Sequence, residues 1–354
     1  MYRHALISSV IVATVTVHAQ YTATYLPSNA PAQTEQGQAG TNKCGGGSDQ
    51  NSMCQNAYIN SVDDFCLWAP PSPGPDSTIG ETEREEVAWC MKSGYGTRLI
   101  PDGTISGAHF VQTPDYVQIT GVGDLTKINI AKTSDDGGEL DPHGADGNGN
   151  PIGGLVFSSA FGQLQQLHEW TNFMGDSQFC FRACKEGGNG PALCNHVYDT
   201  LGCDWNMPAN YDPNVFENCK GDTGEPMGVY GGSTFSQGFP VTPDAHPAPS
   251  SSMCTPTATI GNGAAVAAPS SGSTGTGSTT GSAQTSPATG GTKSGTGTTS
   301  KPTTGTSSKT SSSASGSPTK SSGALAMTAP VVWTRSGIAV VFALVGAVFG
   351  AALI

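Results

Sequence analysis

The sequence predicts an α+β fold: one β-rich domain held together by disulfides, with a few helices, followed by a disordered tail rich in Ser and Thr. Three observations support this prediction. All ten cysteines lie between residues 44 and 254, short alternating apolar and polar runs occur between Gly and Pro turns in the same region, and residues 159–174 have helical periodicity. After residue 254 the composition changes to Ser, Thr, Gly, Ala and Pro.

The clearest strands are expected between residues 109 and 130. Apolar and polar residues alternate over 109–112, 116–119 and 125–130, and turn residues separate these runs. This pattern indicates antiparallel sheet. Residues 98–105, around a Pro-Asp-Gly turn, predict a further hairpin.

The main helix is predicted over residues 159–174, because apolar side chains recur there at three- and four-residue steps. The apolar positions are Phe161, Leu164, Leu167, Trp170, Phe173 and Met174. Shorter helices are expected near Asp63, over 82–91 and over 193–200.

The cysteines form an even set in a chain with features of a secreted protein, so they predict disulfides. They fall into a group of four and a group of six, and pairing within each group is the simplest expectation. Zinc ligation by some of the second group together with His196 is the competing interpretation. The ten residues are Cys44, Cys54, Cys66, Cys90, Cys180, Cys184, Cys194, Cys203, Cys219 and Cys254.

The N-terminal region predicts secretion. Residues 1–19 contain basic residues, an apolar run and small residues at the positions that signal peptidase reads, so cleavage is expected after Ala19. Residues 20–43 are low in apolar content and are expected to form a flexible leader. Residues 44–254 then form the predicted disulfide-bonded globular domain.

The C-terminal region predicts a stalk and a lipid anchor. Residues 255–323 are dense in Ser, Thr and Pro, as in O-glycosylated stalks, and the chain contains no Asn-x-Ser/Thr sequon. Residues 324–354 resemble a glycosylphosphatidylinositol (GPI) signal that is removed when the anchor is attached, at Ser322 or at the neighbouring Ser321 or Gly323. A membrane-spanning helix is the alternative. The predicted location is extracellular, at the cell surface or cell wall, with the lipid anchor in the plasma membrane.

Charge restricts the classes of partner. Between the predicted cleavage site and residue 254 the chain carries nine Lys and Arg and all 27 of its Asp and Glu, a formal charge of −18. Such a domain repels phosphate backbones, so nucleic acid is excluded as an expected partner. Cell-wall polysaccharide is compatible with this composition.

Residues 138–151 form the loop richest in oxygen ligands and glycines. Asp146, Asn148 and Asn150 match the first positions of a calcium-binding loop, but Pro151 and Phe157 occupy positions that require Gly and Glu. A structural loop held by Asx turns is therefore the preferred interpretation and no cofactor is expected, with calcium as the alternative.

Hydrolase motifs are mostly absent from the sequence. No Gly-x-Ser-x-Gly elbow occurs, and no spacing selects a glycosidase pair among five candidate carboxylates. These are Glu139, Asp141, Glu169, Asp199 and Asp204. Trp68 and Trp205 are candidates for stacking on sugar rings, with ordinary packing as the alternative.

Five segments together resemble the fungal macrophage-activating glycoproteins, a secreted family without assigned catalytic residues. The segments are 53–70, 89–98, 141–154, 179–184 and 202–211. The resemblance implies a fungal surface glycoprotein and supplies no catalytic residues, and the function expected for this GPI-anchored chain is a non-enzymatic one. The alternative function is a polysaccharide-binding module or an uncharacterised carbohydrate-active enzyme of the cell wall.

Overall fold

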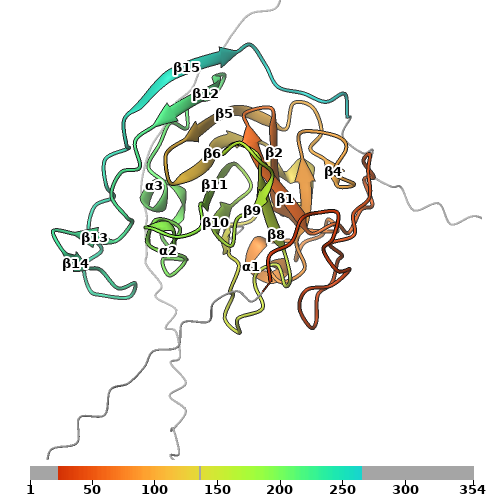
Figure 1. The fold of residues 1–354 in the computed structure, drawn as a ribbon, viewed down its shortest axis with the longest axis horizontal. Helices are drawn as coiled ribbons and strands as arrows, with labels where there is room; N and C mark the ends of the chain where they lie inside the picture. The colour runs from red at the N-terminus through yellow and green to blue at the C-terminus, as the bar shows by residue number, and fades with distance from the viewer. Residues whose placement is uncertain (1–22, 135–136, 265–354) are drawn as a thin grey trace, which may run out of the picture. The chain divides into compact units, whose positions relative to one another are not determined.

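In the computed structural model, which describes residues 23–134 and 137–264, two mixed β-sheets pack against each other (Figure 1). The larger sheet has seven strands, in the order β15 (Ser251–Thr257), β12 (Phe216–Gly221), β5 (Ile105–Gln112), β6 (Tyr116–Gly123), β11 (Gln178–Cys184), β10 (Glu169–Met174) and β7 (Gly138–Leu140). The smaller sheet has six strands, in the order β4 (Arg98–Leu99), β3 (Val87–Cys90), β2 (Asp64–Ala69), β1 (Asn56–Ser61), β8 (Leu155–Ser158) and β9 (Gln165–Gln166).

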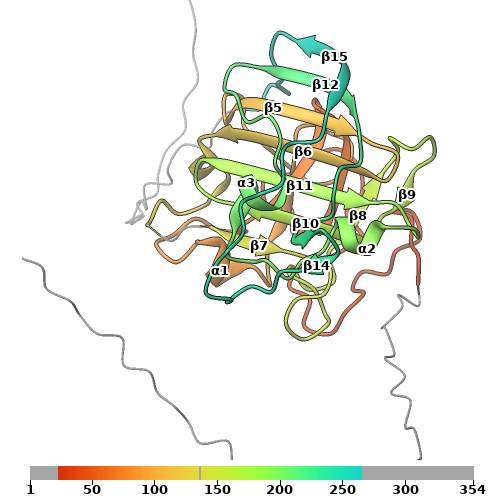
Figure 2. The same ribbon diagram turned by 90° about the vertical axis from the view of Figure 1, so that its left-hand side faces the viewer.

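The remaining elements are short. They are a two-stranded sheet, β13 (Val229–Tyr230) with β14 (Ser233–Thr234), the helices α1 (Ile79–Thr82), α2 (Gly190–Leu193) and α3 (Gly202–Asn206), and a 3-10 helix over Leu125–Ile128. Figure 2 shows the strands of the smaller sheet crossing behind those of the larger one.

The core lies between the two sheets. Trp68 on β2 packs against Trp170 on β10, with ring centroids 5.9 Å apart, and Phe65 stacks on Phe179 of β11 at 5.8 Å. These side chains are buried. Because side chains alternate across a strand, the neighbouring positions of β10 point away from this core, toward the outer face of the large sheet. Glu169, at the start of β10, is one of them.

The predicted main helix over 159–174 is wrong, and with it the α+β fold class. This segment contains a turn at Gly162, where φ is +113°, followed by β9 and β10. Strand β10 pairs on both sides, with β7 and with β11, so the sheet satisfies its backbone groups. A short run of aromatic residues and Thr fits a strand as well as a helix, and tertiary pairing decides between them. The three α-helices in the described residues have only four or five residues each.

Of the other local predictions, some are confirmed and some are wrong. Strands over 109–112 and 116–119 are confirmed within β5 and β6, which form an antiparallel pair. The strand over 125–130 is wrong, because a 3-10 helix begins there. The hairpin over 98–105 is also wrong, since β4 and β5 belong to different sheets.

The short helices were predicted with little success. The chain at Asp63 is the turn between β1 and β2, and residues 87–90 form β3. Of residues 193–200, only Leu193 is helical, as the last residue of α2.

Five disulfides confirm the prediction that the cysteines are oxidised. All five join cysteines within one of the two predicted groups: Cys44–Cys54, Cys66–Cys90, Cys180–Cys203, Cys184–Cys194 and Cys219–Cys254. The zinc interpretation of these cysteines is therefore excluded, because each one is in a disulfide.

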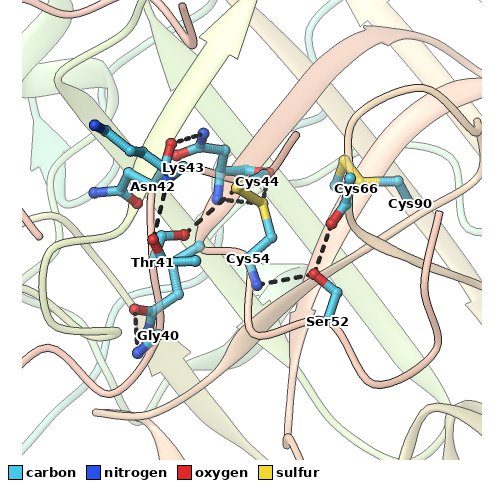
Figure 3. Close-up of a disulfide and its surroundings, with 12 residues drawn as sticks. Gly40, Thr41, Asn42, Lys43, Cys44, Ser52, Cys54, Cys66 and Cys90 are labelled. Atoms are coloured by element: carbon cyan, nitrogen blue, oxygen red, sulfur yellow. Dashed lines mark hydrogen bonds between the residues drawn. A yellow bond between two sulfur atoms is a disulfide. The ribbon is translucent and has the colours of Figure 1, made fainter. Parts of the chain in front are cut away.

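The packed region includes residues on both sides of 44–254. Figure 3 shows residues 40–44 beside the Cys44–Cys54 disulfide, where the Thr41 amide donates to Met53 and the Thr41 carbonyl accepts from Gln55. At the other end, the side chain of Asn262 donates to the carbonyls of Met91 and Ile100. The leader and the first residues of the predicted stalk thus contact the domain.

The predicted signal peptide 1–19, the rest of the stalk from residue 265, the anchor positions 321–323 and the tail 324–354 lie outside the described residues. Within the part that is described, no helix is long and apolar enough to cross a membrane.

Candidate functional site

A cleft of about 770 Å³ opens beside β7, at one edge of the large sheet. Figure 2 shows β7 as the last strand of that sheet, next to β10. Polar and acidic side chains line much of the cleft, and none of its described lining residues is Lys or Arg. They include Glu83, Glu139, Asp141, Asn150, Asp176, Gln178, His196 and Asp199.

Glu139 is a buried acid of the cleft. It lies opposite Phe173 in the pairing of β7 with β10, and the Thr171 hydroxyl donates a hydrogen bond of 2.6 Å to its Oε1. Burial, reinforced by the nearby Asp141 carboxylate, raises the pKa of Glu139 well above its usual value. Glu139 therefore keeps its proton at a higher pH than an exposed glutamate does.

Asp141 lies among the other acidic residues that line the cleft and influences them. Its Oδ1 accepts the backbone N–H groups of His143 and Gly144, each at 2.7 Å, which fixes the turn that follows β7. Burial raises the pKa values of Glu83 and Asp199, and the charge of Asp141 raises them further. The cleft therefore holds several carboxyl groups that influence one another.

Two histidines and a glutamate adjoin these acids. The imidazole rings of His143 and His196 stack with centroids 4.6 Å apart. His143 Nε2 lies 3.8 Å from Glu169 Oε2, and His196 Nδ1 lies 3.3 Å from Asp141 Oδ1. Interaction with Glu169 raises the pKa of His143, against the opposing effect of burial. Two imidazoles and a carboxylate are a common ligand set for transition metals.

Appressorium protein ROW2 of Mycosarcoma maydis is 53% identical to this chain over 268 residues, which cover 74% of the chain and 92% of ROW2. The chain belongs to the family of this fungal protein. Appressorium protein ROW1 of the same fungus is 58% identical over 231 residues, which are 64% of the chain and about half, 53%, of ROW1. No protein-family model and no solved structure matches the chain. The predicted fungal origin of the family is thus confirmed.

The residues predicted for calcium do not form one site. Asp146 pairs with Arg84 at 2.7 Å and accepts the Asn148 amide, as in an Asx turn. Asn150 is buried, lines the cleft and pairs through its backbone with Asp141. Asn150 of this loop therefore lines the cleft, while Asp146 lies at the surface beside Arg84.

The two tryptophans proposed for sugar stacking lie apart. Trp68 is fully buried in the core between the sheets. Trp205 packs with Tyr198 and Phe235 in a separate cluster, and its indole N–H donates to the Pro243 carbonyl at 2.8 Å. Neither residue lines the cleft.

The sequence indicated several residues of the cleft but did not show that they lie close together. Glu139, Asp141 and Asp199 appear among the candidate carboxylates, and their convergence depends on the β7–β10 pairing. His143 was not considered, nor was Glu83. His168, in the loop before β10, is instead buried and bonded to Glu186. The available signal was the density of polar residues between 138 and 151.

Proposed function

We propose that this chain is a non-enzymatic glycoprotein of the fungal cell surface, which displays its acidic domain outward from a GPI anchor at Ser322, Ser321 or Gly323. The five disulfides carry the proposal, because such bonds persist in oxidising, extracellular compartments. The relationship to ROW1 and ROW2 supports a role at the appressorium. The resemblance to macrophage-activating glycoproteins is compatible with outward display.

Release from intact cells tests this function. Phosphatidylinositol-specific phospholipase C should release the anchored protein from the surface of fungal protoplasts into the medium. A variant in which Ser321, Ser322 and Gly323 are all replaced by Leu should not be displayed, because GPI attachment requires small residues. A chain that stays on the cells after phospholipase treatment, or that the triple variant still displays, would contradict the anchor.

A second candidate function is polysaccharide binding in the cleft. Its lining combines Glu139, a carboxyl group whose pKa burial raises well above its usual value, with the amides of Asn150 and Gln178. Such groups can both donate to and accept from sugar hydroxyls. A buried acid with a raised pKa is also what a glycosidase uses to protonate its leaving group, so an enzyme of polysaccharides is the related alternative.

Pull-down on chitin and β-glucan distinguishes these functions. If the cleft binds polysaccharide, Asp199→Asn should weaken retention, and the exposed Asp244→Asn should leave it unchanged. Released oligosaccharide would show enzymatic activity. Equal retention of both variants would place any binding outside the cleft, and no retention on either polymer would remove this candidate.

A further inference from the structure

We propose that His143, Glu169 and His196 bind a divalent transition-metal ion of the zinc type beside the acidic cleft, whose lining includes His196. Their ligand atoms all lie within 4.8 Å of one another. This inference goes beyond surface display, which requires no metal.

The fold brings the three residues together through strand pairing and one disulfide. Leu140 at the end of β7 lies opposite Asn172 of β10, so the chain that continues past β7 runs toward Glu169 and carries His143 there. Glu169 lies opposite Cys184 of β11, and the Cys184–Cys194 disulfide fixes the segment that contains His196. The strand pairing and the disulfide therefore place the three side chains close together.

The distances suit an ion between the side chains. Zinc bonds to His nitrogen and carboxylate oxygen are about 2.0–2.2 Å long, so an ion can bridge the 3.8 Å between His143 Nε2 and Glu169 Oε2. Elsewhere in the domain the comparable pair, His109 with Glu217, is in direct contact at 2.9 Å and contains a single imidazole. Two imidazoles with one carboxylate favour a transition metal over Ca²⁺, which prefers oxygen ligands.

The site is partly open to solvent. The side chains of His143, Glu169 and His196 are 29%, 23% and 21% exposed. Three protein ligands at a partly open position leave a coordination position for water or a ligand group. An ion bound there would therefore be accessible from the solvent.

Asp141 would orient both histidines. Its Oδ1 lies 3.3 Å from His196 Nδ1 and accepts the backbone N–H of His143. A carboxylate near Nδ1 favours metal binding through Nε2 of His196, which is the usual arrangement of a second-sphere partner. Asp141 thus lies beside the ring of one ligand and holds the backbone of the other.

The surroundings favour a cation. The described residues that line the cleft include five acids and no Lys or Arg, so the negative potential of the ionised carboxylates attracts positive ions. Asn150 is buried beside the same loop, and its Oδ1 has no donor among the described residues. This oxygen can accept a hydrogen bond from a water molecule.

Zinc titration of the full chain tests the site. The chain, produced in a fungal host and stripped with a chelator, is titrated with Zn²⁺ in a calorimeter. We expect one Zn²⁺ per chain, binding at least about 100-fold more weakly in the double variant His143→Ala, His196→Ala, because loss of a mere outer-sphere partner already costs 10- to 100-fold. The matched control His246→Ala, outside the cleft, should bind as the wild type does. Unchanged affinity in a folded double variant overturns the proposal.

Cobalt spectroscopy on the wild-type chain keeps the test valid if the double variant fails to fold. Co²⁺ at this site should give the intense visible absorption of a four- or five-coordinate ion, and one equivalent of Zn²⁺ should remove it. Weak bands typical of octahedral oxygen coordination, or displacement by Ca²⁺ at a similar concentration, would overturn the proposal. Phospholipase release from cells does not depend on these results, so failure of the metal site leaves the anchor proposal intact.

Discussion

Replacing Glu139 with Gln should stabilise the domain at neutral pH. The Gln side chain has the shape of a protonated Glu, can accept the Thr171 hydroxyl hydrogen bond and can donate toward Asp141. It removes the charge that a buried Glu139 would otherwise acquire beside Asp141. The substitution therefore imitates the protonated state of the wild type at every pH.

The size of the effect follows from linkage. The pKa of Glu139 is raised in the folded protein above its ordinary value of 4.5, so the folded state binds this proton more tightly than the unfolded chain does. The contribution is fully present below the unfolded pKa, and stability falls as pH rises toward the folded pKa. In that window one proton changes the free energy of unfolding by about 1.4 kcal/mol per pH unit.

Urea unfolding at intervals from pH 4 to pH 8, in the presence of a chelator, measures the difference between variant and wild type. We expect near equality at pH 4 and a growing advantage for Glu139→Gln at higher pH. The exposed Glu85→Gln makes the same charge change at the surface and should show a much smaller pH dependence. A difference that does not change with pH, or a variant less stable than the wild type at pH 7, would refute the reasoning.

Three further substitutions test the fold. Trp170→Ala should lower the free energy of unfolding by about 3–5 kcal/mol, measured in urea, because it leaves a cavity between the sheets. Replacing both Cys219 and Cys254 with Ala should cost about 4 kcal/mol in the same assay, since their disulfide closes a loop of 35 residues. Burial and Asp64 raise the pKa of Tyr58 to about 12, so Asp64→Asn should lower this value in an alkaline absorbance titration.

Each of these tests has a control. Leu164→Ala removes an exposed side chain and should change stability by less than about 0.5 kcal/mol. The shorter Cys44–Cys54 loop, with a separation of 10, should give a smaller loss of about 3 kcal/mol. Asp63→Asn, at an exposed neighbouring acid, should leave the tyrosine titration where it is. Equal losses for the two disulfides would contradict the loop-length argument, and a small loss for the tryptophan would contradict its place in the core.

The sequence was informative where local pattern and tertiary environment agree. Strands β5 and β6 were predictable because alternation, turn residues and burial all favour a strand there. Over 159–174 the apolar spacing fitted a helix, but β10 lies between two partner strands that satisfy its backbone. That information comes from residues 138–140 and 178–184, which a local window does not contain.

The cleft depended even more on distant contacts. Glu83, Asp141 and His196 come from three separate parts of the chain, Glu169 beside the cleft comes from a fourth, and spacing alone gave no reason to group them. The grouping arises from a strand at the sheet edge and from the Cys184–Cys194 disulfide. The number of cysteines was enough to predict that disulfides form. Even the correct grouping of the cysteines, however, does not show which other side chains a particular disulfide brings close together.

The way the acids are partnered gives a reason to expect a ligand in this cleft. Outside it, three acids pair with basic residues: Asp146 with Arg84, Asp64 with Lys92 and Asp124 with Lys127. The described lining of the cleft contains five carboxyl groups and no Lys or Arg; Lys132 pairs with one of them, Asp176, and the charges of the other acids oppose one another. Apolar residues at these positions would remove that cost, since burying acids without basic partners weakens a fold. A bound cation offsets the repulsion and uses the two histidines as well, which is why we favour a metal over a purely structural explanation of the cleft.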